Sequence, residues 1–235
     1  MQWEEEVCIV SGDNRAWQEE AKTVIELWCR SRSGHSSMLL VNGLRPYVEI
    51  SDTKSDGDSD ESEFLSKVSS VRGVQGEPES SGMKLSQDGV VRPHYRVYVN
   101  DTTKVRGVRK SLSEQGWRVT SADILFFQRL LLDLDLGPHI VTKGEVLWAG
   151  ERAPEGAKTP ENTNREIAEK RIQAVGGSGI YPLDMVVSCD ISGLSRAEPF
   201  PAPFVTMSFD LETSIADNTI LCAAAVVDRY GERKE

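Results

Sequence analysis

Two carboxylates that could bind a metal ion stand near the end of an apolar run, residues 204–214, of the 235-residue chain. Residues two apart on a strand point to the same face, so Asp210 and Glu212 can share one divalent cation while Phe209 and Leu211 point into a core. Oxygen ligands suit Mg²⁺ or Mn²⁺, and two such ions can activate water and stabilise the leaving oxygen of a phosphodiester. The pattern indicates phosphodiester hydrolysis, although an Asp-x-Glu pair by itself is more often a solvated strand end.

The elements around this pair give it context. Residues 214–218 are polar and residues 219–228 read as a second buried strand, so a hairpin is predicted. Two such strands resemble the opening hairpin of a ribonuclease-H-like nuclease sheet. The run Ser-Phe-Asp-Leu-Glu-Thr-Ser at residues 208–214 is similar to the first exonuclease motif of family B DNA polymerases, Phe-Asp-Ile-Glu-Thr. The resemblance implies that Asp210 and Glu212 are catalytic residues and metal ligands of a 3′→5′ proofreading exonuclease.

The resemblance to family B polymerases extends upstream. Residues 43–50, Gly-Leu-Arg-Pro-Tyr-Val-Glu-Ile, resemble the Arg-Pro-Tyr strand in the N-terminal domain of the archaeal members. Residues 105–110 and 121–133 resemble two helical segments of the same domain, in the same order and at about the same spacing. The four matches together cover most of the chain.

A second site is implied by this upstream resemblance. Archaeal family B polymerases capture template uracil in a pocket formed by these segments. Carried over by motif, the pocket residues here are Pro46, Val105, Ile124, Phe126 and Arg129. An apolar slot can stack a flipped pyrimidine, backbone amides can read its edge and a cation can hold the adjoining phosphate.

The pocket match has departures and an alternative. The family often has proline where this chain has Thr102 and Leu125, and its N-terminal tyrosine has no located counterpart here. The alternative is that Ile124 and Phe126 are ordinary core residues.

A cationic patch is predicted on residues 104–115, which read as a helix. Lys104, Arg106 and Arg109 fall within two turns and could face phosphates. The alternative is an ordinary amphipathic helix whose Val105, Val108 and Leu112 face the core while the cations face water.

Composition places the chain among soluble globular proteins, with 39% hydrophobic and 27% charged residues. We expect an intracellular, nucleoid-associated protein, since no run is long enough for a membrane span and no signal peptide is visible. The net charge of -10 argues mildly against nucleic-acid binding, but much of it lies in the acidic run at residues 51–62. The scattered cysteines are expected to be buried and the three histidines to be isolated loop or surface residues.

Periodicity predicts strands at residues 7–11, 23–30, 37–41, 45–50, 94–100, 117–120, 145–149 and 183–191. Beside the helix at 104–115, a second helix is predicted at 121–134, with Ser121 as its N-cap and apolar residues almost all round. Residues 51–90 are predicted to be an acidic, flexible insertion with a Ser/Gly-rich linker up to about residue 83. Residues 154–171 read as a polar insertion with helical character.

The predicted fold is an α+β N-terminal domain over residues 1–199, followed by the opening hairpin of an incomplete ribonuclease-H-like α/β exonuclease domain over residues 200–235. Prolines at 199, 201 and 203 mark the linker between them. The family's other exonuclease carboxylates and its polymerase palm lie on later segments. The chain alone is therefore expected to show little nuclease activity and no polymerase activity, and its apolar hairpin to be poorly ordered.

Two functional interpretations remain open. In the first, the chain is the N-terminal part of a DNA-directed DNA polymerase, either a truncated reading frame or one subunit of a split enzyme. Its partners are then the single-stranded template, the primer 3′ end and the remaining polymerase domains, in cis or as a second subunit, with no membrane. In the second, it is a non-catalytic module that binds single-stranded DNA or senses uracil, and its Asp-x-Glu pair is vestigial.

Overall fold

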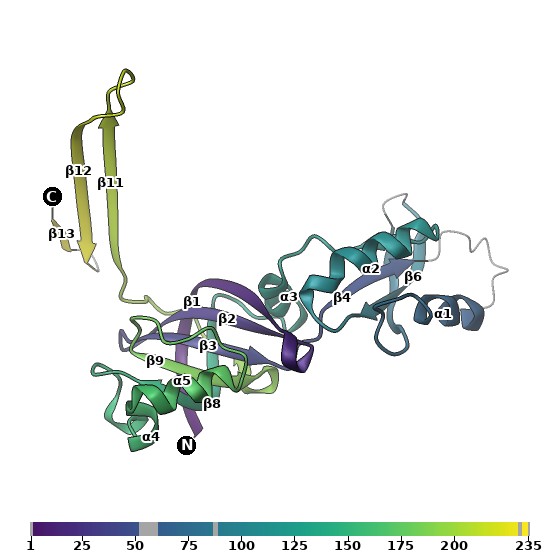
Figure 1. The fold of residues 1–235 in the computed structure, drawn as a ribbon, viewed down its shortest axis with the longest axis horizontal. Coiled ribbons are helices and arrows are strands. Elements are labelled where there is room, and N and C mark those ends of the chain that lie inside the picture. The colour runs from purple at the N-terminus through teal and green to yellow at the C-terminus, as the bar shows by residue number, and fades with distance from the viewer. Residues whose placement is uncertain (1, 52–60, 87–88, 230–231, 235) are drawn as a thin grey trace.

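The computed structural model describes residues 2–51, 61–86, 89–229 and 232–234. Figure 1 shows a sheet built from both halves of the chain, a second sheet covered by helices, and a hairpin near the C-terminus that projects away from both. The mixed α+β character that the sequence predicts is confirmed. None of the described helices is long and apolar enough to cross a membrane.

The first sheet is nearly a barrel. Its strand order is β1-β2-β3-β9-β8-β10, and β1 also pairs with β8, so five strands close on themselves. The bounds are β1 Gln2–Trp17, β2 Lys22–Ser31, β3 Ser36–Asn42, β8 His139–Ala149, β9 Met185–Asp190 and β10 Leu194–Arg196. A β-bulge between Ile9 and Ser11 bends β1 where it passes from β8 to β2. The strand is therefore much longer than the predicted 7–11.

Successive residues of the barrel strands alternate between two cores. Leu39 lies in the interior cluster with Ile25 and Leu27, whereas its neighbour Leu40 packs against Ile172. Ile172 belongs to α5 (Arg165–Gln173), which follows the short α4 (Pro160–Thr163) and confirms the helical character predicted at 154–171. Because both faces are covered, β2, β3 and β9 read as nearly continuous apolar runs.

The second sheet has the order β5-β6-β4-β7, with β4 Tyr47–Ser51, β5 Glu79–Leu85, β6 Val91–Tyr98 and β7 Arg118–Thr120. Helices α1 (Glu61–Ser69) and α2 (Thr102–Glu114) contribute to its core, to which Phe64, Val68, Val108 and Leu112 belong. The predicted linker up to residue 83 is wrong, since α1 and β5 are folded parts of this layer. Residues 52–60 of the acidic insertion lie outside the described residues.

Helix α3 (Phe126–Asp133) connects the two layers, and the sequence misplaced its start. Ser121 has a φ of 60° and is not an N-cap; Leu125 occupies that position without a side-chain cap bond. The helix is also not buried all round, since Phe126 and Leu130 are buried but Leu132 is 67% exposed. The prediction of α2 holds, and its N-cap is Asp101, whose carboxylate accepts from the Thr103 amide at 2.8 Å.

The hairpin comprises β11 (Val205–Thr213) and β12 (Ile220–Arg229), and the short β13 (Glu232–Lys234) pairs with β12. Both long strands fall where the sequence predicts them. Phe209 is 65% and Leu211 46% exposed, so the expectation that they enter a core is not met by the described part of the chain. Figure 1 shows the reason, because none of the other described helices and strands lies against the hairpin's faces.

Two smaller predictions also need correction. Cys222 is exposed on the hairpin, although the other three cysteines are buried as expected. His94 is buried within β6, and the His139 ring lies edge-on to Phe200, with Nε2 2.9 Å from the Phe200 carbonyl oxygen. Short 3-10 turns at Gln18–Glu20, Glu155–Ala157 and Ile191–Gly193 complete the fold.

Candidate functional site

A pocket of about 560 Å³ lies between α2, α3 and the start of β4. We call it the Phe126 pocket. All five residues that the sequence motifs assign to a template pocket line it: Pro46, Val105, Ile124, Phe126 and Arg129. These residues come from three separate segments, and the tertiary structure brings them to one place.

The apolar wall of the Phe126 pocket is partly core. Phe126 is 6% exposed and belongs to the barrel's interior cluster, so the core alternative holds for its packing even as its surface lines the pocket. Ile124 is 38% exposed, so it is not a core residue. Pro46 is buried and Val105 half-buried. The pocket is therefore an apolar slot with a firm floor and an open rim.

Arg129 is buried, with 4% of its surface exposed. Its Nη2 donates to the Ser121 carbonyl oxygen, and its guanidinium lies 4.1 Å from the centre of the Tyr47 ring. The hydrogen bond spans the turn that carries Ser121 in a left-handed conformation. Arg129 thus supports the pocket wall, residues 121–125, which is a different task from holding a phosphate in solvent.

Tyr47 joins this wall to the second sheet. Its hydroxyl donates to both carboxylate oxygens of Asp133, at 2.8 and 2.9 Å, and a second guanidinium, that of Arg96, lies 4.7 Å from its ring centre. Burial, with a further contribution from the Asp133 hydrogen bond, raises the pKa of Tyr47 to about 12. The phenol therefore stays protonated and keeps donating at any physiological pH.

The predicted phosphate patch lies on the exposed side of α2. Lys104, Arg106 and Arg109 are all exposed, while Val108 and Leu112 are buried, as in an ordinary amphipathic helix. Arg106 lines the Phe126 pocket, and the other two cations do not. A phosphate role for the three remains a prediction.

The two predicted metal ligands lie on the hairpin. Asp210 and Glu212 share one face of β11, opposite Ala224 and Cys222 of β12. Neither carboxylate has a hydrogen-bond partner among the described residues. No group of three or more His, Cys, Asp or Glu side chains able to hold a metal ion occurs in the part of the chain that the structure describes. The donor type suits Mg²⁺ or Mn²⁺, but two carboxylates do not complete a site for either ion.

Comparison with known proteins gives a fold. No family model matches the chain, and no curated protein matches it. Among solved structures, it is similar to the family B DNA polymerase from the hyperthermophilic archaeon Pyrobaculum calidifontis, with a TM-score of 0.62, 17% sequence identity and 97% of this chain covered. The chain has a fold found in a family B DNA polymerase. It spans 26% of the length of that polymerase chain, and at this identity the likeness is one of fold.

Within this polymerase-like fold, the sequence reasoning missed the contribution of β1 to the pocket. Asn14 and Ala16 line it, and the Asn14 Nδ2 lies 3.3 Å from Thr102 Oγ1, which accepts from it. Thr102 is also fixed at its backbone, where its amide donates to Thr23 Oγ1 at 2.9 Å. Residues 11–17 are mostly polar and gave no signal for a strand. The long apolar run of β2 was the available clue, because such a strand needs a neighbour to pair with and the residues just before it are the nearest candidates.

Proposed function

We propose that this chain handles the template strand for a DNA polymerase of the family B type. In this proposal the Phe126 pocket receives a base of single-stranded DNA, with a preference for uracil. The observation that carries it is that five residues named by sequence motifs line one pocket, in a chain whose fold is similar to a family B polymerase over 97% of its length.

The pocket chemistry supports base capture. Apolar surfaces from Pro46, Val105 and Phe126 can stack on a flipped pyrimidine, whose ring has no charge to desolvate. Asn14 and Thr102 offer an amide and a hydroxyl at the same pocket for the polar edge of the base. Lys104, Arg106 and Arg109, exposed on α2, would lie along the adjoining phosphates.

The hairpin has a separate proposed role in 3′→5′ proofreading at the primer 3′ end. Asp210 and Glu212 would supply two of the carboxylates that hold Mg²⁺ or Mn²⁺, and further carboxylates must come from other polymerase domains, in cis or as a second subunit. The apolar face of β11, formed by Val205, Met207, Phe209 and Leu211, is the surface that such domains would cover.

A second candidate function is a non-catalytic uracil-sensing module. The observation that favours it is that the chain itself brings the five motif residues to one pocket, whereas no group of three or more side chains able to hold a metal ion occurs among the residues that the structure describes. The module requires DNA binding by the chain alone, and the polymerase role requires a partner for activity.

Base capture is tested by titrating the chain against a labelled single strand that contains one uracil and against its thymine twin. We expect tighter binding of the uracil strand, with the difference lost in Phe126→Ala and reduced in Ile124→Ala, which lies on the rim and leaves the core intact. Phe209→Ala removes an exposed phenylalanine on the hairpin and should keep the difference. Equal binding of both strands by the wild type would contradict the proposal.

The exonuclease role is tested with Mg²⁺ and a 3′-labelled strand. The chain alone is expected to release little or no nucleotide, because two carboxylates hold the ion poorly. Robust digestion by the pure chain, abolished in Asp210→Ala, would show that the site is complete and overturn this part of the proposal.

A further inference from the structure

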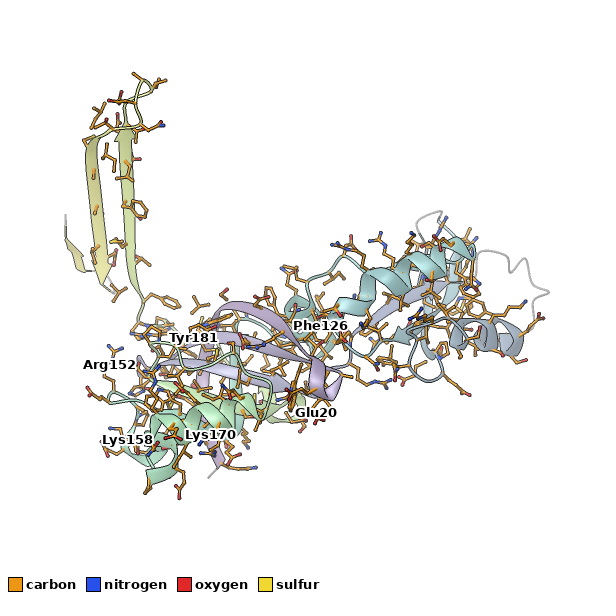
Figure 2. The ribbon with its side chains drawn as sticks, viewed as in Figure 1. Glu20, Phe126, Arg152, Lys158, Lys170 and Tyr181 are labelled. Atoms are coloured by element: carbon orange, nitrogen blue, oxygen red, sulfur yellow. The ribbon has the colours of Figure 1, made fainter. Side chains whose placement is uncertain are left out.

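A second pocket, of about 620 Å³, adjoins the Phe126 pocket at Pro46, which lines both. We call it the Trp17 pocket. It is formed by the end of β1, the 3-10 turn after it, the start of β2 and the segment between β3 and β4. Figure 2 labels one residue of each pocket, Phe126 and Glu20, and both lie at the end of the barrel that faces the second sheet. The two pockets are therefore close enough for one strand of DNA to reach both.

Trp17 gives this pocket an aromatic wall that is held in place. A Cβ on Gly176 would lie only 2.9 Å from the indole Cδ2, so the backbone of Gly176 packs directly against the ring. The ring also lines the Trp17 pocket. Nζ of Lys22 lies 5.9 Å from its centre. A fixed indole beside a cation can stack on a base of any sequence and place a cation near its phosphate.

Three side-chain amides also line the pocket, those of Asn42, Gln75 and Asn100. None of them has a hydrogen-bond partner elsewhere in the described chain. Each carries both donors and an acceptor, so together they can meet the mixed edge of a nucleobase. Amides suit this edge better than charged side chains do, because the removal of water from a neutral amide costs less free energy than its removal from an ion.

The charges at the pocket favour a neutral ring inside and phosphates outside. Lys22 and Arg45 are offset by Glu20 and Asp190, so these four lining residues carry no net charge. The Glu20 carboxylate lies 3.4 Å from Lys22, and that of Asp190 is held by the Ser192 amide at 2.9 Å. Lys22 and Arg45 have side chains 62% and 54% exposed, with weak, solvated ion pairs that a phosphate can replace.

We propose that the Trp17 pocket binds the base of the nucleotide next to the one in the Phe126 pocket, with Pro46 as the wedge between the two bases. Trp17 stacks on the base, the amides contact its edge, and Lys22 and Arg45 hold the flanking phosphates. This inference rests on the proposed function, because it needs a single strand whose neighbouring base occupies the Phe126 pocket. It goes further in assigning a second site that no sequence motif marked.

The test uses fluorescence anisotropy with a short single strand that contains one uracil, and with two versions in which the neighbour on either the 5′ or the 3′ side is abasic. In the wild type, one abasic neighbour should weaken binding about tenfold, in line with the stacking of one base on an aromatic side chain. Trp17→Ala should weaken binding of the intact strand by a similar factor. The variant should then bind the intact strand and that abasic strand with equal affinity. Its preference for uracil over thymine should remain, because the Phe126 pocket is unchanged.

Lys22→Ala provides a variant that leaves the packing intact, and Lys143→Ala is its control. Both lysines sit on strands, are exposed to a similar degree (62% and 55%) and have one glutamate partner. Lys22→Ala should weaken binding a few-fold and reduce the slope of log affinity against log salt concentration by about one. Lys143→Ala should change neither the affinity nor the slope.

If an abasic neighbour weakens binding by the same factor in the wild type and in Trp17→Ala, the second site is overturned, even where the preference for uracil remains. Trp17-dependent binding of free deoxycytidine monophosphate, with no effect of either abasic neighbour, would overturn the assignment to a DNA strand. A wild type without uracil preference contradicts the proposed function itself, and the inference falls with it.

Discussion

Strands β9 and β11 have similar sequences and opposite surroundings. Both are apolar runs in which a serine stands two residues before an aspartate, Asp190 in β9 and Asp210 in β11. β9 lies between β3 and β8 and is buried along most of its length, whereas every residue of β11 is exposed. An apolar composition therefore indicates that a strand is to be covered by another element, but it does not show whether that element belongs to the same chain.

Their carboxylates differ in the same way. Asp190 accepts backbone and side-chain hydrogen bonds from Ser192, which hold the pKa of its carboxyl below the ordinary value. Asp210 and Glu212 have no such partner among the described residues. The β9 carboxylate is already used to shape a turn, while the β11 pair is open to a ligand.

The largest expected contrast is in proteolysis. A two-stranded hairpin without a covering layer is marginal, so brief digestion with a protease that cuts after large apolar residues should cleave at Phe209, Leu211 or Leu221 first. We expect the hairpin to be cleaved at least about a hundredfold faster than the barrel. Mass spectrometry of the fragments identifies the sites of cleavage. A hairpin as resistant as the barrel would mean that a second chain covers it and would break the comparison.

The second contrast is in core energetics. Leu39 is fully buried inside the barrel, so Leu39→Ala should lower the free energy of unfolding by about 2–5 kcal/mol in a urea titration. Phe209→Ala removes a larger side chain but from the exposed hairpin, and should change it by less than about 0.5 kcal/mol. A comparable loss in both variants would place Phe209 in a core.

A smaller effect separates the hydroxyls of Tyr47 and Tyr98, two of the three tyrosines on the strands of the second sheet. Tyr47→Phe removes the hydroxyl whose single hydrogen is shared between the two carboxylate oxygens of the half-buried Asp133, and should lower the free energy of unfolding by about 1–2 kcal/mol. Tyr98→Phe is the matched control, because its hydroxyl donates to the exposed Glu79 at 2.9 Å and should matter by less than about 0.5 kcal/mol. Tyr47→Phe should also reduce the preference for uracil, since it loosens the wall that Arg129 supports. Equal effects of the two substitutions would argue against that wall.

The smallest effect is in acid stability. Burial raises the pKa of Glu49, but the hydrogen bond and charge of Lys84, with the charge of Arg96, outweigh it and leave the pKa below the ordinary value. A lowered pKa means that the unfolded chain binds the proton more readily, so this stability is present above about pH 4.3 and is lost as the pH falls further. In Glu49→Gln the loss of stability with acid should be shallower than in the wild type, and an unchanged loss would contradict the role given to Glu49. Unfolding titrations from pH 6 to pH 3 measure this.

The segment that sequence reasoning misjudged most, residues 61–85, shows why local signals fall short. Helix α1 is 9 residues long and buries only Phe64 and Val68, too little to be stable alone. It is held by the sheet, where the Phe64 ring lies 5.4 Å from that of Tyr95, and the Tyr95 hydroxyl donates to Glu61 at 2.6 Å. Those partners lie some thirty residues away, so no local window contains them.

The sequence by itself determined the positions of α2, of the hairpin strands and of β2, β3, β4, β6 and β9, because their hydrophobic periodicity is local and strong. It also named five of the residues that line the Phe126 pocket, because their motifs keep their order along the chain, and their binding of a template base stays a prediction. Only the tertiary structure decided that β1 closes the barrel, that Arg129 supports Ser121, and that the Trp17 pocket adjoins the first at Pro46. Each of these depends on contacts between segments far apart in the chain, whose geometry is set by packing rather than by any local preference.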